Sequence, residues 1–139
     1  MSRIIVDTGP LVALLNARDE FHDWTRDTLD RLEPPLLTCE PVLAEASHLV
    51  RKLPGGPQAV LDLVARGVLD VVFRVDAEVF ALRRLLAKYA SLPMSLADAC
   101  LVRMVELMPD ATILTLDADF RVYRRSGRLV IPVLMPDRR

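Results

Sequence analysis

Short runs rich in β-branched residues alternate along this chain with longer segments of helical periodicity. This alternation is typical of β-α-β units, which form a parallel sheet covered by helices on both faces. We therefore expect an α/β fold with a parallel sheet of about five strands, in a single domain that spans residues 1–139. The predicted strands are Arg3–Val6, Leu36–Thr38, Leu69–Arg74, Ala111–Thr115 and Leu129–Leu134.

The segments between these strands predict helices, because their apolar residues recur with the helical period. The sequence Pro54-Gly55-Gly56-Pro57 predicts a turn between two helices and is too short for a domain linker. The predicted helices are Pro10–Asn16, His22–Leu32, Pro41–Leu53, Gln58–Arg66, Ala77–Tyr89, Leu96–Met108 and a short one from Asp119 to Arg125.

The composition is that of a protein with a substantial core, since 52% of the residues are hydrophobic. No apolar run approaches the roughly 20 residues that cross a bilayer, and the N-terminus opens on a strand-like run. We expect a soluble cytoplasmic protein without a membrane segment. Cys39 and Cys100 lack metal-ligand spacing, which favours reduced, packed thiols.

The formal net charge of -1 gives no overall basic field for binding nucleic acid. Binding of that kind would depend on local groups of cations, and the simpler interpretation of any one group is a solvated helix face. The candidate groups are Arg51 with Lys52, Arg83 and Arg84 with Lys88, and the C-terminal set Arg121, Arg124, Arg125 and Arg128.

Four acids stand at places where the predicted topology could bring them together. Asp7 and Asp117 follow predicted strands, and ligands of open α/β sheets bind beyond the carboxyl ends of the strands. Glu45 and Asp98 lie on predicted helices. Carboxylates gathered at one point repel one another and raise each other's pKa, so such a site usually holds a divalent cation. The pattern predicts a metal-dependent reaction on a phosphate.

Each acid also has a structural interpretation. Asp7-Thr8-Gly9 can form a turn and cap a helix; an aspartic-protease reading of the same tripeptide requires an all-β body, which this chain lacks. Ser95 and Asp98 fit a capping box, and Asp117 or Asp119 could cap the short helix that follows. Glu45 could be a solvated helix residue.

Two threonines accompany these acids. Thr8 follows Asp7 directly, and Thr115 lies two residues before Asp117. Both hydroxyls can be ordinary turn groups, or one of them can orient a water molecule or a carboxylate.

The order and surroundings of four segments resemble those of the PIN-domain ribonucleases, especially the toxin half of VapBC-type toxin–antitoxin pairs. The resemblance covers essentially the whole chain, and each short motif is weakly specific alone. The segments are Val6–Leu11, Pro41–Glu45, Ser95–Ala99 and Thr115–Phe120.

The resemblance implies a single PIN-like nuclease domain in which Asp7, Glu45, Asp98 and Asp117 are the catalytic acids and bind Mg²⁺ or Mn²⁺. Thr8 or Thr115 would support them. The family's last acidic position is the least consistently used, so the choice between Asp117 and Asp119 stays open.

The function implied by this resemblance is a metal-dependent endoribonuclease that hydrolyses RNA phosphodiester bonds as the toxin of a type II pair. Its expected partners are an RNA substrate, a cognate antitoxin that inserts a peptide over the acidic pocket, and a second copy in a homodimer. Two alternatives belong to other classes. One is a catalytically silent PIN-like interaction module, and the other is a small-molecule phosphohydrolase.

Overall fold

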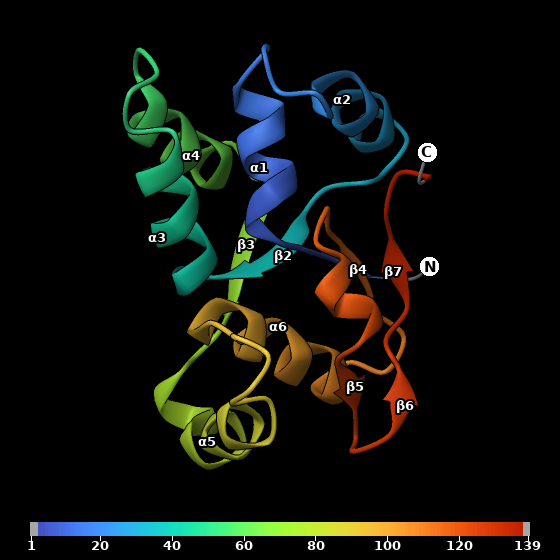
Figure 1. Ribbon diagram of the computed structural model, residues 1–139. Coiled ribbons are helices and arrows are strands. Elements are labelled where there is room, and N and C mark those ends of the chain that lie inside the picture. Colours follow the sequence, from blue (N-terminus) through green and yellow to red (C-terminus); the bar gives the residue numbers. More distant parts are fainter. Residues whose placement is uncertain (1–2, 138–139) are drawn as a thin grey trace.

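The computed structural model describes residues 3–137 and contains a five-stranded sheet in the order β3-β2-β1-β4-β7 (Figure 1). All four pairings in this sheet are parallel. The expectation of an α/β fold on a parallel sheet of about five strands is therefore confirmed. The strands are β1 (Ile4–Val6), β2 (Leu36–Cys39), β3 (Leu69–Phe73), β4 (Thr112–Leu114) and β7 (Val133–Leu134).

Helices cover the sheet on both sides, with α1 to α4 on one side and α5 and α6 on the other (Figure 1). Two short 3₁₀ helices, η1 (Asp76–Glu78) and η2 (Ala118–Arg121), precede α5 and follow β4. No helix in the described part of the chain has the length and apolar character to cross a membrane. The α-helices are α1 (Thr8–Leu15), α2 (His22–Asp30), α3 (Glu40–Leu49), α4 (Gly56–Ala65), α5 (Val79–Lys88) and α6 (Leu96–Leu107).

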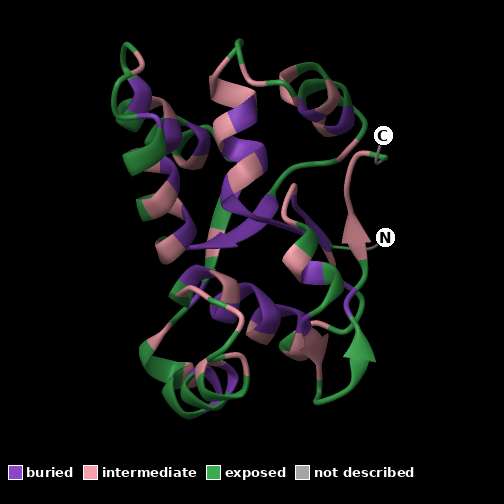
Figure 2. Ribbon diagram, in the orientation of Figure 1, coloured by how far each residue is buried: buried purple, intermediate pink, exposed green. Residues whose placement is uncertain are grey.

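The core lies on both faces of the sheet, and Figure 2 shows the central strands and α6 as mostly buried. Helix α6 is apolar almost all round, and seven of its twelve residues are buried. It can occupy this position because the helix is covered by the sheet on one side and by α5 and β5 on others. Cys39 and Cys100 are buried free thiols within this core, as predicted.

The C-terminal segment differs from the prediction. The expected strand Leu129–Leu134 is two strands, β6 (Leu129–Val130) and β7, with Pro132 between them. Proline has no amide hydrogen to donate to a sheet, so pairing is interrupted there. Strand β6 pairs with β5 (Arg124–Arg125) in an antiparallel hairpin, so the expected helix Asp119–Arg125 is wrong over its last residues. Ser126 and Gly127 turn this hairpin with φ values of 50° and 88°.

The strand order contains one reversal that determines where a ligand can bind. From β1 the chain adds β2 and then β3 on one side, and it returns to place β4 on the other side of β1. Open α/β sheets have a crevice at such a reversal, beyond the carboxyl ends of the two strands involved. Here these strands are β1 and β4, which end immediately before Asp7 and Thr115.

Two glycines in the turn into α4 provide a test of how this fold is packed. A Cβ on Gly56 would lie 2.0 Å from the backbone oxygen of Val50, whereas a Cβ on Gly55 would meet no atom within 4 Å. We predict that Gly56→Ala lowers the free energy of unfolding by about 3 kcal/mol, because the backbone must move. Gly55→Ala should cost only about 1 kcal/mol, for its left-handed φ. Urea unfolding of both variants measures this, and equal losses would contradict the packing described.

Candidate active site

Asp7 lies at the strand reversal and is held on both carboxylate oxygens. It is the N-cap of α1, and its Oδ1 accepts a hydrogen bond from the Thr8 amide at 2.7 Å. Its Oδ2 accepts from the Thr115 hydroxyl at 2.8 Å. The residue is only 6% exposed. The capping role is thus real, and it places a buried carboxylate between β1 and β4.

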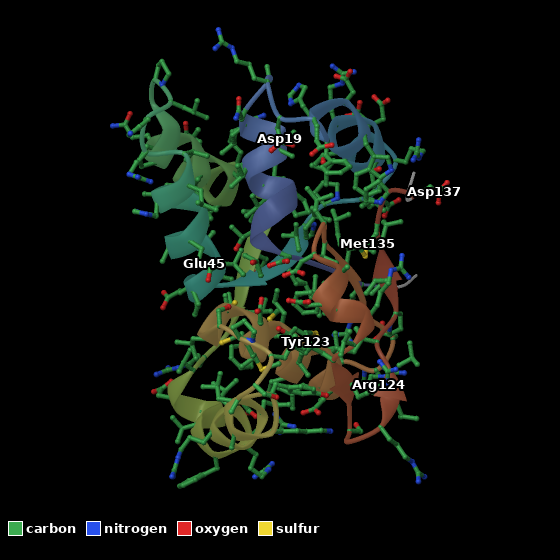
Figure 3. All side chains as sticks on the ribbon, in the orientation of Figure 1. Asp19, Glu45, Tyr123, Arg124, Met135 and Asp137 are labelled. Atoms are coloured by element: carbon green, nitrogen blue, oxygen red, sulfur yellow. The ribbon has the colours of Figure 1, made fainter. Side chains whose placement is uncertain are left out.

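Glu45 comes to the same place from α3. Its Oε1 accepts a hydrogen bond from the Thr8 hydroxyl at 2.9 Å, which links α3 to the start of α1. Glu45 is half-buried, and it is labelled on α3 in Figure 3. Glu45 is therefore held at the site by a threonine.

Asp98 is the third residue of α6 and forms the predicted capping box. The Ser95 amide donates to Asp98 Oδ2 at 3.1 Å, and the Asp98 amide donates to Ser95 Oγ at 3.0 Å. The Tyr123 hydroxyl donates to the same Oδ2 at 3.2 Å. Since both donors use one oxygen, Asp98 Oδ1 receives no hydrogen bond from any residue between 3 and 137.

Asp117 follows β4 and caps η2. Its amide donates to the Thr115 hydroxyl at 2.9 Å, and its Oδ1 accepts from the Asp119 amide at 2.9 Å. Asp117 is among the charges that raise the pKa of Asp7 and of Asp98, whereas Asp119 acts in this way on Tyr123. Of the two candidates for the fourth acid, Asp117 is the one whose charge acts on both Asp7 and Asp98.

These acids carry negative charge that the protein does not neutralise. Burial, followed by the charges of Asp98 and Asp117, raises the pKa of Asp7 to about 6 despite its two hydrogen bonds. Burial and the charges of Asp117 and Glu45 likewise raise the pKa of Asp98. None of the four acids, nor Asp119, forms an ion pair with a base in the described part of the chain. The site is a cluster of unpaired acids.

Tyr123 is a site residue that the sequence did not reveal. Its ring is buried and packs edge-on against Tyr89, with centroids 5.0 Å apart, and against Phe120 at 5.2 Å. This packing directs the hydroxyl toward Asp98, and Figure 3 labels the residue beside the site. Tyr123 lies 25 positions from Asp98 in a segment expected to be helical, so no spacing pattern pointed to the contact.

Two roles were considered for the threonines, and the structure shows the one in which a hydroxyl orients a carboxylate, since each hydroxyl donates to an acid. Thr8 donates to Glu45 and Thr115 to Asp7. While these hydrogen bonds are formed, no three acids, histidines or cysteines among residues 3–137 are arranged so that they could hold a metal ion. The acids share one region, and hydroxyl groups fix one oxygen each of Asp7, Glu45 and Asp98.

Comparison with known proteins agrees with this architecture. The family model described as the PIN domain matches residues 4–126. Ribonuclease VapC26 of Mycobacterium tuberculosis (strain ATCC 25618 / H37Rv) is 30% identical over 116 residues, which cover 82% of this chain and 86% of that protein. The crystal structure of VapC20 of Mycobacterium tuberculosis, described as a sarcin-ricin loop cleaving toxin, has a TM-score of 0.71 and 23% identity. That match covers 92% of this chain and 98% of VapC20, and it shows that the two folds are alike. The chain therefore belongs to the PIN-domain family, and within it to the VapC-type ribonucleases, as its motifs predicted.

Proposed function

We propose that this protein is a metal-dependent endoribonuclease that acts as the toxin of a toxin–antitoxin pair. The observation that carries this proposal is the group of unpaired acids at the reversal between β1 and β4. Membership of the PIN-domain family and a sequence identity of 30% to a ribonuclease support hydrolysis of RNA. The acids support dependence on a divalent cation.

The donor atoms at the site fit Mg²⁺ or Mn²⁺, which prefer oxygen ligands. Glu45 Oε2, Asp98 Oδ1 and Asp117 Oδ2 accept no hydrogen bond from the described residues, so each could bind a cation without losing a protein contact. Asp7, buried between them, would complete the set. A cation bound there supplies an activated water and stabilises the charge that develops on the phosphate.

The remaining polar groups of the site position these acids. Three hydroxyls each donate to one oxygen of an acid and so fix the orientation of that carboxylate. They belong to Thr8, Thr115 and Tyr123. The capping box fixes Asp98 on the first turn of α6, where the positive end of the helix dipole favours its ionised form. Substrate would therefore meet carboxylates that are already oriented.

The two alternative functions receive less support. A silent interaction module has no need of five acids without a basic partner, and such a group around the buried Asp7 reduces stability. A small-molecule phosphohydrolase would fit the same acids, but the similarity to a ribonuclease over 82% of the chain favours RNA.

The same site suggests how the activity would be controlled. A cognate antitoxin that places a basic side chain among the unpaired acids would neutralise them and exclude both cation and substrate.

Exposed apolar side chains on β3 and α5, among them Phe80 at 72% exposure, support a homodimer. Such a protein would act on RNA in the cytoplasm.

The role of Asp98 can be tested by Asp98→Asn, which removes the charge but keeps an oxygen and the size of the side chain. We expect RNA cleavage in Mg²⁺ to fall at least 100-fold, because a cation loses one of its ionised ligands. Stability should fall by no more than about 1 kcal/mol, for the weakened cap. Asp62→Asn, an exposed change on α4, is the matched control and should cleave normally. A folded Asp98→Asn protein that cleaves at the wild-type rate would exclude this assignment.

The raised pKa of Asp7 predicts a specific dependence of stability on pH in EDTA. Because folding favours the protonated carboxyl, Asp7 contributes full stability below its ordinary value of 3.8 and loses it as the pH rises to about 6. Such a rise in the pKa of Asp7 corresponds to about 3 kcal/mol. We therefore expect Asp7→Asn to gain about that much stability over wild type between pH 4 and pH 7 in urea unfolding. A difference between the two proteins that does not change with pH would contradict the buried, unpaired state of Asp7.

A further inference from the structure

A basic cavity of about 420 Å³ lies between α5, α6 and the β5–β6 hairpin, apart from the acidic site. Four cations line it together with a single acid, Glu106, and its size is in the range of small-ligand sites. The cations come from three elements far apart in the sequence. They are Arg84 and Lys88 on α5, Arg103 on α6 and Arg124 on β5.

Most of the positive charge in this cavity is not neutralised by the protein. Arg103 is paired with Glu78 at 2.6 Å and with Glu106 at 3.1 Å. By contrast, Arg84, Lys88 and Arg124 form no ion pair with any acid among residues 3–137. The cavity thus carries a surplus of cations in a chain whose formal net charge is -1.

Neutral acceptors hold two of these cations in place while leaving their charge available. The Lys88 ammonium donates to the Gly127 carbonyl at 2.7 Å. One nitrogen of Arg124, Nη1, donates to the carbonyls of Arg121, Val122 and Tyr123 at 2.7, 3.0 and 3.2 Å. The other guanidinium nitrogens of Arg124 have no acceptor in the described part of the chain, so they can donate to an anion.

Two tyrosines connect this cavity to the acidic site. Tyr123 donates to Asp98, and the next residue, Arg124, lines the cavity. Lys88 also lines the cavity, and the next residue, Tyr89, packs on Tyr123 and accepts a hydrogen bond from the Arg124 amide at 2.8 Å. Figure 3 shows Tyr123 and Arg124 in succession on the segment that leads from the site to β5. One strand of nucleic acid could therefore contact both places.

We propose that this basic cavity binds a backbone phosphate of the RNA, on one side of the bond that is cleaved. The proposal rests on the function proposed above and specifies how the substrate is held. Arginine and lysine are the side chains that bind phosphate oxygens, and such contacts fix the position of a strand without reading its sequence. The cavity compensates for the acids, which by themselves repel RNA.

The test uses Arg84→Ala with Lys88→Ala, which removes two cations that take no part in the acidic site. Binding of a fluorescent single-stranded oligoribonucleotide is measured by anisotropy in EDTA, so that the RNA stays intact. We expect Kd to rise at least tenfold, and the slope of log K against log salt to fall in magnitude by about 0.7, since one phosphate contact is lost. The double substitution to Arg84→Lys and Lys88→Arg keeps both charges and should bind like wild type.

Arg18→Ala is the matched control, because Arg18 is exposed in the connection between α1 and α2, at the opposite end of the molecule from α5 (Figure 1). It should change neither Kd nor the salt slope. In Mg²⁺, the alanine double variant should cleave RNA with a raised KM and an unchanged kcat.

Unchanged RNA binding and salt slope in a folded alanine double variant would overturn this proposal. An acidic protein segment as the true occupant of the cavity would give that result. The binding measurement is made without metal and without cleavage, so it decides the role of the cavity separately from the catalytic proposal. Failure of Asp98→Asn to reduce cleavage would count against the acidic site alone.

Discussion

The repulsion between the buried carboxylate of Asp7 and the half-buried acids around it is the constraint on which the rest of this structure depends. Asp7 is 6% exposed, and the acids around it have no basic partner among residues 3–137. A buried carboxylate without a counter-charge destabilises the folded state when it is ionised. The fold tolerates this cost because β1 and β4 are fixed by parallel pairing and by a nearly fully buried core.

The acids of the site come from both sides of the sheet and are held by contacts on both sides. Glu45 comes from the side covered by α1 to α4 and Asp98 from the side of α5 and α6, so the site forms only when both layers are packed. Thr8, Thr115 and Tyr123 hold one acid each, and none of them offers a positive charge. The positive charge lies instead beyond the tyrosine pair, in the cavity lined by Arg84, Lys88 and Arg124. This separation suits a substrate that is itself a chain of anions.

Local patterns in the sequence predicted much of this structure. The parallel sheet, the positions of the helices and the caps at Asp7, Asp98 and Asp117 follow from periodicity and capping preferences, which are local. The β5–β6 hairpin was missed because Arg124 and Arg125 have no strand-like pattern and depend on a partner strand beyond the turn. Tyr123 was missed for a similar reason, since its contact with Asp98 depends on the packing of two other rings. The sequence also placed Arg84 and Lys88 in one group of cations and Arg124 in another, and only the fold shows that all three line one cavity.

The central claim is that these acids together form one site for a divalent cation, and the effect of Mn²⁺ on thermal unfolding tests it most directly. A cation that binds only the folded protein stabilises it by about 2.7 kcal/mol at a concentration of 100 times its Kd. We predict that Mn²⁺ raises the melting temperature of wild type by several degrees and leaves that of the double variant Asp7→Asn with Asp98→Asn unchanged. Equal shifts in the two proteins, or no shift in wild type, would contradict it.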